Sequence, residues 1–177
     1  MVTQHTQRDL VGPAQATAIR NLIQSLLVSE LIQPSKTLWL ASAWVSDIEV
    51  IDNTAQQFSA LEPDWTARPI KLSEALCAIA RHGAEVVAIL RDDPHNLPFV
   101  ERLRRSPEGQ KRAIHWLLEP DFHEKGLLGD DYSLDGSMNF TFRGITVNDE
   151  HLVYRTDAAA VAERHQVMER RWRAKLT

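Results

Sequence analysis

The sequence predicts an α/β fold, with a mixed β-sheet flanked by helices. Up to residue 119, short apolar runs rich in strand formers alternate with stretches of helical periodicity, which is typical of parallel strands joined by helices. Three more short strand-like runs follow, which suggest antiparallel additions and hence a mixed sheet.

The first elements are a helix and a buried strand. Between Pro13 and Pro34, apolar residues from Ile19 to Leu31 recur at helical spacing and predict an amphipathic helix. Residues 37–45, TLWLASAWV, are rich in strand formers and predict a buried strand.

The middle of the chain continues the alternation. Asp52 or Asn53 is a suitable cap for a short helix through Leu61, and a proline-flanked loop follows. The later predicted elements are a helix over 70–82 closed by Gly83, a strand over 84–90, a helix from DDPHNLP through Leu103 and a strand over 112–119.

The C-terminal part is predicted to hold short strands and one long helix. The strands are expected near residues 125–128, 132–135 and 151–155, and Asp157 caps a last helix from Ala158 to Lys175. Four of the seven glycines lie between Gly126 and Gly144, so backbone freedom is concentrated there.

Length and composition indicate an ordinary globular chain. At 177 residues, with 44% apolar and 25% charged residues, the chain is expected to form a single domain, residues 1–177. No apolar run approaches the roughly 20 residues of a membrane-spanning helix, and the N-terminus lacks the pattern of a signal peptide. We therefore expect a cytoplasmic protein without a membrane partner.

Charge and cysteine content exclude some kinds of site. The net charge of −4 argues against a surface that coats nucleic acid generally, although a local basic cleft stays open. Two basic clusters, at residues 102–112 and 164–175, are more simply explained as solvated helix faces balanced by glutamates. The single cysteine, Cys77, excludes an internal disulfide and a cysteine-built metal site.

Residues 123–139, HEKGLLGDDYSLDGSMN, gather the most unusual polar side chains. On a strand, His123 and Lys125 would project from the same face, because side chains alternate with a period of two. A turn then delivers Ser137 and Asn139. An ammonium, a hydroxyl and a carboxamide suit anionic phosphoryl oxygens, and an imidazole can attack phosphorus or transfer a proton. Each residue alone is more often structural; their joint spacing favours a site.

This spacing resembles the HKD signature of the phospholipase D superfamily. The matching positions are His123, Lys125, Asp130, Gly136, Ser137 and Asn139, followed by the apolar Phe140. The interval from Asp130 to Gly136 holds five residues instead of the usual six, which a hairpin shorter by one residue would absorb. The signature covers about a sixth of the chain. A single motif in a short chain resembles the bacterial single-motif nucleases, and SMNFTFRGITVNDEHLVY resembles the phospholipase D-like proteins of bacterial 7-deazaguanine DNA-modification clusters (DpdK type).

The resemblance implies the α-β-α sandwich of that family, with which the order of predicted strands and helices agrees, and a metal-independent mechanism at a shared site. His123 would be the nucleophile, Lys125 and Asn139 would hold the phosphoryl oxygens, and Glu150 would hydrogen-bond the ring of His123. Ser137, Asp130 and Gly136 would bind phosphate or support these groups. Since the family uses two histidines, a homodimer would bring a second His123 to the site. No metal or other cofactor is expected.

The sequence offers further residues for the site and more than one function. Trp44, Asp47, Arg91 and Asp92 follow the first two strands and could line the cleft, although Trp44 fits the core at least as well. The resemblance favours a phosphodiesterase, most simply a nuclease acting on DNA. The alternatives are a lipid or small-molecule phosphodiesterase, and a phosphate- or nucleic-acid-binding module of a DNA-modification or defence complex with little turnover.

Overall fold

The computed structural model describes residues 6–176, which form nine strands and six α-helices. The strands are Gln7–Val11 (β1), Thr37–Ser42 (β2), Glu49–Ile51 (β3), Ile70–Lys71 (β4), Glu85–Arg91 (β5), Ile114–Glu119 (β6), Gly126–Gly129 (β7), Tyr132–Gly136 (β8) and His151–Arg155 (β9). The helices are Ala16–Ile32 (α1), Leu72–Arg81 (α2), Leu97–Arg105 (α3), Pro107–Gln110 (α4), Phe142–Thr146 (α5) and Ala158–Trp172 (α6). Short 3₁₀ turns cover Pro13–Gln15, Pro94–Asn96 and Arg173–Lys175.

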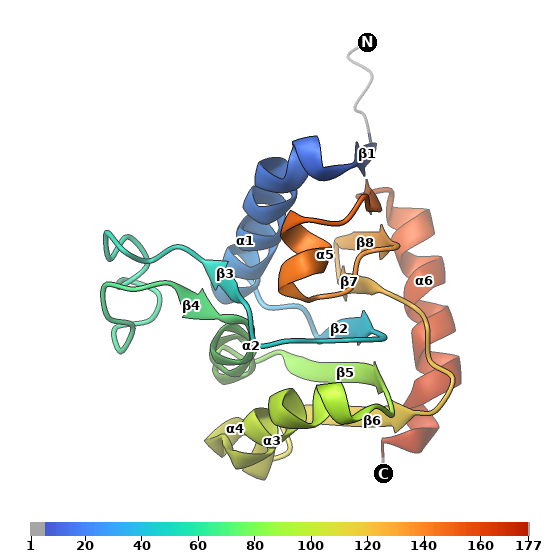
Figure 1. Cartoon of the computed structure of the whole chain (residues 1–177). Helices are drawn as coiled ribbons and strands as arrows, with labels where there is room; N and C mark the ends of the chain where they lie inside the picture. Colours follow the sequence, from blue (N-terminus) through green and yellow to red (C-terminus); the bar gives the residue numbers. More distant parts are fainter. Residues whose placement is uncertain (1–5, 177) are drawn as a thin grey trace.

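Seven strands form one mixed sheet, in the order β1-β9-β8-β7-β2-β5-β6. Strands β2, β5 and β6 pair in parallel, and every pairing from β2 through β7, β8 and β9 to β1 is antiparallel. The predicted mixed sheet is therefore confirmed. Because of this topology, the carboxyl ends of β2, β5 and β6 lie beside the start of β7 and the end of β8 (Figure 1).

Helices cover both faces of the sheet, as the sandwich prediction requires. Side chains alternate along the buried strand β2: Leu38 and Leu40 join the apolar cluster that contains residues of α1, α2 and α3. Trp39 and Ala41 join a second cluster, which contains Trp172 and other residues of α6. In Figure 1, α6 stands alone on its side of the sheet.

Several local predictions are confirmed. Helix α2 ends beside Gly83, whose φ of +118° is one that residues other than glycine rarely adopt. Asp157 caps α6 by accepting a hydrogen bond from the backbone N–H of Ala160 at 2.9 Å. The helix that starts after Pro13 and the strands near residues 85, 114, 126, 132 and 151 also lie where the sequence places them.

Two predictions between residues 37 and 61 are wrong. Strand β2 ends at Ser42, three residues early, because residues 44–46 turn away to bond with Asn139 and Phe140. Residues 53–61 form turns and not a helix. The buried Asn53 side chain bonds the carbonyl of Thr66 and the N–H of Phe58, which closes a loop.

Two elements carry little sequence signal. Strand β1 is mostly exposed and lacks apolar alternation, yet it pairs with β9 along five residues. Helix α5 spans only five residues, and the Thr141 side chain caps it. None of the helices in residues 6–176 is both long and apolar enough to span a bilayer.

Candidate active site

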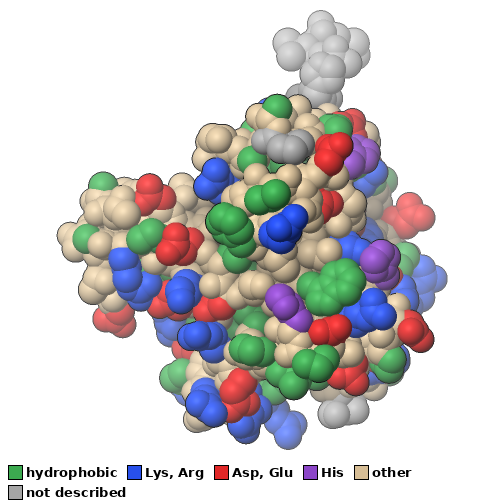
Figure 2. All heavy atoms as spheres, viewed as in Figure 1, with side chains coloured by type: hydrophobic (Ala, Val, Ile, Leu, Met, Phe, Trp, Pro, Cys, Tyr) green, Lys and Arg blue, Asp and Glu red, His purple; other side chains and the backbone are tan. Residues whose placement is uncertain are grey.

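Apart from Asp130, the polar motif residues of the HKD-like stretch lie at the edge where the parallel strands end. Gly126, the first residue of β7, pairs with Ala41 near the end of β2 and with Asp135 near the end of β8. His123 and Lys125 therefore enter the sheet at the carboxyl ends of the parallel strands, which is where ligands of open α/β sheets gather. Figure 2 shows histidine, basic and large apolar side chains over this end of the sheet.

Lys125 lies in the extended segment before β7 and not in a regular strand. Its side chain is only 8% exposed, and its Nζ donates a hydrogen bond to the carbonyl oxygen of His123 at 2.6 Å. Burial lowers the pKa of Lys125, the Glu150 carboxylate opposes this shift, and Arg91 adds to it. Since an ammonium has three donors, two N–H groups stay available for a phosphoryl oxygen.

His123 is exposed, two residues before the buried lysine. Its ring forms none of the hydrogen bonds found among residues 6–176, while its carbonyl oxygen accepts the bond from Lys125. The imidazole is thus open to solvent and to a ligand. This arrangement suits a nucleophile, because the attacking nitrogen must be accessible.

Asn139 is held in one orientation by the chain that follows β2. Its Oδ1 accepts a hydrogen bond from the backbone N–H of Trp44 at 3.1 Å, so its Nδ2 is left as a donor. The next residue, Phe140, is tied to the same loop through the Ser42 hydroxyl and the N–H of Ser46. Two segments that lie about 95 residues apart in the chain therefore position one carboxamide.

Gly144 allows α5 to approach this turn. A Cβ atom at Gly144 would lie 2.2 Å from the carbonyl oxygen of Asn139. Any side chain there would displace the asparagine. The requirement for glycine at this position is one that the sequence analysis missed.

Ser137 and Glu150 form a pair that fixes the turn after β8. The Ser137 hydroxyl donates to Glu150 Oε2 at 2.5 Å and accepts from the N–H of His151 at 3.0 Å. Asn148 Nδ2 donates to the other oxygen of Glu150 at 3.1 Å. Glu150 is 8% exposed, so this carboxylate is buried, hydrogen-bonded and close enough to Lys125 to influence its pKa.

The expected hydrogen bond from Glu150 to the ring of His123 is absent from the described residues. The reason is the pairing of β8 with β9, which sets the N–H of Ser137 against the carbonyl of His151. The carboxylate of Glu150 therefore meets the Ser137 hydroxyl. Within this chain, Glu150 acts on the turn and on Lys125.

Asp130 does not lie at the site, contrary to the expectation from the motif. It occupies the turn at the other end of β7, where its Oδ2 accepts from the N–H of Lys36 at 3.1 Å and its own N–H donates to Ser35. Four residues of strand separate it from Lys125. Asp130 therefore anchors the β7–β8 hairpin to the start of β2.

Gly136 serves the packing of the sheet. A Cβ atom there would lie 2.1 Å from the carbonyl oxygen of His151 and 3.0 Å from Leu152 Cα. Glycine is needed for the close approach of β8 and β9. In this way Gly136 supports the Ser137 turn.

Trp44 and Arg91, which were expected near the cleft, lie against each other. The guanidinium carbon of Arg91 lies 5.5 Å from the centroid of the Trp44 ring, and Trp44 Nε1 donates to Asp93 Oδ2 at 3.4 Å. The sequence analysis missed Asp93, although its place after β5 is the available signal. Asp47 has another role, because it accepts from the N–H of Ser73 at the start of α2.

The two basic clusters are largely neutralised by ion pairs. The pairs are Arg102–Asp47, Arg104–Glu101, Arg105–Glu101, Arg164–Glu124, Arg164–Asp135, Arg171–Glu124, Arg173–Glu85, Arg173–Glu169 and Lys175–Glu119. Most of their charge thus stabilises local structure. By contrast, Lys125, Arg91 and the exposed Arg143 of α5 form no ion pair within residues 6–176, so no carboxylate neutralises these three cations in a direct pair.

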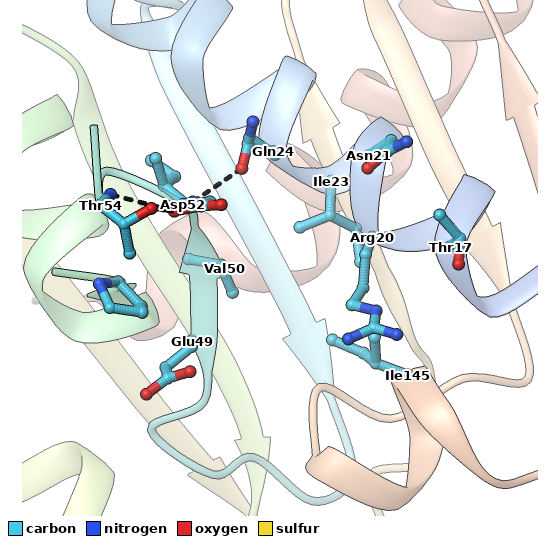
Figure 3. A pocket seen from close by; sticks show the side chains of 12 residues that line it. Thr17, Arg20, Asn21, Ile23, Gln24, Glu49, Val50, Asp52, Thr54 and Ile145 are labelled. Atoms are coloured by element: carbon cyan, nitrogen blue, oxygen red, sulfur yellow. Dashed lines mark hydrogen bonds between the residues drawn. The ribbon is translucent and has the colours of Figure 1, made fainter. Parts of the chain in front are cut away.

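Other parts of the molecule offer less chemistry. A cavity of about 350 Å³ lies between α1 and β3, where Gln24 accepts from the N–H of Asp52 (Figure 3). None of the motif residues, all of which the structure describes, lines it. Within residues 6–176, no three His, Cys, Asp or Glu side chains cluster as metal ligands.

The sequence and the fold were compared with known proteins. The family model described as "Cardiolipin synthase, PLD-like domain" matches residues 45–172, well over half of the chain. No protein of curated function matches the sequence.

Several solved structures share the fold. NucT from Helicobacter pylori superposes with a TM-score of 0.59 at 15% identity, covering 93% of each chain. Nuc from Salmonella typhimurium, described as a phospholipase D family member, gives a TM-score of 0.57 at 16% identity, covering 94% of this chain and 95% of that one. An archaeal chromatin protein with a novel mode of DNA binding, TrmBL2, gives a TM-score of 0.55 at 14% identity; the match covers 98% of this chain and only 54% of that protein.

Proposed function

The chain belongs to the phospholipase D-like family, and from this premise we propose that it is a nuclease that hydrolyses phosphodiester bonds of DNA. The observation that carries the proposal is the group of three side chains at one edge of the sheet. His123 is exposed, Lys125 is buried with free donors, and the Nδ2 of Asn139 is left unbonded by the Trp44 contact to Oδ1. We take residues 1–177 as one domain of this type.

In the proposed reaction, an imidazole nitrogen of His123 attacks phosphorus and the bond to the leaving oxygen breaks. A phosphohistidine forms, and a second imidazole donates a proton to the leaving oxygen. Water then attacks phosphorus, giving up a proton to that second imidazole and releasing His123. Lys125 and Asn139 donate hydrogen bonds to the non-bridging oxygens, where negative charge increases in the transition state.

We propose that the second imidazole is the His123 of another copy of the chain. One copy carries one motif, and closed two-fold dimers are the commonest oligomers. Helix α5 lies next to Asn139; its first residue, Phe142, is 66% exposed, and Val147, directly after its end, is 48% exposed. Burying each such side chain stabilises an interface by up to about 1.5–3 kcal/mol, which supports a dimer formed at this edge of the sheet.

Nucleic acid is favoured as the substrate by the cations around the site. Arg91 and Arg143 form no ion pair within the described residues and lie on elements that border the motif, so they are available for flanking phosphates. The DNA-binding protein among the structural neighbours has a similar fold. Other proteins of a DNA-modification or defence system are the proposed partners.

Lipid and pure binding functions are the alternatives. The description of the matching family model names cardiolipin synthase, an enzyme of phospholipids, so phospholipids should be tested as substrates. Two observations favour a binding module. The Ser137 hydroxyl already donates its hydrogen bond to Glu150, and within residues 6–176 the ring of His123 has no hydrogen-bond partner that would orient it for catalysis.

Cleavage assays separate these functions. We expect the wild-type protein to cut circular single-stranded DNA or plasmid and His123→Ala to be inactive, while both bind DNA. His115→Ala is the matched control, since His115 lies near the amino end of β6, away from the site, and should keep full activity. Binding without cutting would favour the binding module, and hydrolysis of phospholipid alone would favour the lipid enzyme.

A further inference from the structure

Trp44 differs from the other tryptophans of this chain. The chain has five tryptophans. Trp39, Trp65 and Trp172 are buried in the two apolar clusters, and Trp116 packs against one of them. Trp44 is partly exposed and belongs to neither cluster among the described residues. The sequence allowed Trp44 to be a core residue, but packing in the core does not explain why this position carries a large apolar ring.

The main chain of Trp44 is fixed against the phosphate-binding carboxamide. Its N–H donates to Asn139 Oδ1 at 3.1 Å, and its carbonyl oxygen accepts from the Ser42 hydroxyl at 2.6 Å. The indole is thus carried by the same residue whose backbone orients Asn139. A nucleotide whose phosphate binds Asn139 would have its sugar and base within reach of this ring.

The indole itself is also held in place. Its Nε1 donates to Asp93 Oδ2 at 3.4 Å, and Asp93 is in turn fixed by accepting from the N–H of His95 at 2.9 Å. The guanidinium of Arg91 lies over the ring at 5.5 Å from the centroid, within cation–π range. A ring held at its edge and supported by a cation is a ready stacking surface.

Arg91 adds positive charge beside the ring. Arg91 forms none of the ion pairs found within residues 6–176. The pKa of Asp93 is lowered mainly by the hydrogen bond from the N–H of His95, and the charge of Arg91 contributes less. Arg91 and Lys125 flank the carboxyl end of β2 from its two neighbouring strands, because Leu90 pairs with Ser42 and Gly126 pairs with Ala41. Arg91 also contributes to the lowered pKa of Lys125. An anion bound here would therefore meet Arg91 as well as Lys125.

We propose that Trp44 and Arg91 form a nucleotide subsite in which an unpaired base stacks on the indole and Arg91 contacts the adjoining phosphate. The proposal rests on the proposed nuclease function and adds the substrate class, single-stranded or locally unpaired nucleic acid. In a duplex, the base is paired and stacked, and turning it onto Trp44 costs a few kcal/mol. In a single strand, most of that cost is absent, because the base is free to stack on an aromatic side chain.

The test measures binding to the His123→Ala protein, which cannot cut. Two fluorescent oligonucleotides of equal length are compared, one with bases and one abasic throughout, so that both carry the same phosphates. We expect the Trp44-containing protein to bind the oligonucleotide with bases more tightly, on the order of 10- to 100-fold for one stacked base. A duplex of the same sequence should bind more weakly than the single strand.

Substitutions assign the effect to the subsite. Trp44→Leu should remove the difference between the two oligonucleotides, Trp44→Phe should keep part of it, and Arg91→Met should weaken binding of both. Trp116→Phe, the matched control on β6, should behave as the parent protein. All variants keep the backbone N–H of residue 44, so the bond to Asn139 is not removed.

The outcomes distinguish this inference from the proposed function. Equal affinity for both oligonucleotides in the Trp44-containing protein, or an unchanged difference after Trp44→Leu, would overturn the subsite and leave a nuclease that holds phosphates alone. Failure of the protein to bind any oligonucleotide at low salt would overturn both proposals.

Discussion

Glu150→Gln tests how the buried carboxylate supports the site. In the structure, Glu150 accepts from Ser137 at 2.5 Å and from Asn148 at 3.1 Å. Glutamine keeps one acceptor oxygen and turns an NH₂ group toward the other donor, so one charge-assisted hydrogen bond is lost. Such a bond contributes about 1.5–3 kcal/mol. We expect the free energy of unfolding to fall by about 1–3 kcal/mol and Tm by about 2–4 °C for each kcal/mol lost.

The same substitution should change catalysis through Lys125. The Glu150 carboxylate opposes the lowering of the Lys125 pKa by burial, so its removal lowers that pKa further. Since the reaction needs the charged ammonium, the alkaline limb of the pH–rate profile should move to lower pH. Loss of the Ser137 anchor also loosens the turn that carries Asn139, and we expect activity to fall on the order of 10²-fold.

Chemical denaturation and the pH dependence of cleavage measure the two effects. Glu163→Gln is the matched control, because Glu163 is exposed on α6 and should change stability by less than about 0.5 kcal/mol. An alkaline limb that stays in place while activity falls would refute the electrostatic link to Lys125. Unchanged stability and activity would refute the whole role of Glu150.

Two further predictions concern packing and metal. Gly136→Ala should destabilise the fold by at least about 1–3 kcal/mol in chemical denaturation, because its Cβ would lie 2.1 Å from the carbonyl of His151; wild-type stability would show that β8 and β9 separate easily. Cleavage should persist in EDTA, since Lys125 and Asn139 are proposed to stabilise the phosphoryl oxygens; complete inhibition that only a divalent metal restores would contradict the mechanism.

The local part of the site could be predicted from the sequence. His123, Lys125 and Asn139 lie within 17 residues, and their types alone indicate phosphate chemistry. The hydrogen bond from Trp44 to Asn139 could not be predicted from this spacing, because it joins residues about 95 positions apart in the chain. The place of Asp130 follows from strand geometry: at about 3.3 Å per residue, β7 carries the chain away from Lys125.

Elements with weak local signals needed the tertiary structure. Strand β1 is mostly exposed and contains charged residues, so its sequence does not predict a strand. Its strand conformation follows from its pairing with β9. The partners of Glu150 depend on the β8–β9 register, which the loop between the two strands does not specify. By contrast, the cap at Asp157 and the glycine after α2 could be predicted because each acts within a few residues.

In the proposed reaction, His123 forms a covalent bond to phosphorus. The direct measurement is mass spectrometry of the protein after brief reaction with a labelled oligonucleotide and denaturation in alkali, under which phosphohistidine survives. We expect a phosphoryl-linked adduct on the peptide that contains His123. The adduct should be absent from His123→Ala and present in His115→Ala. Rapid cleavage by His123→Ala, or an adduct on another residue, would contradict it.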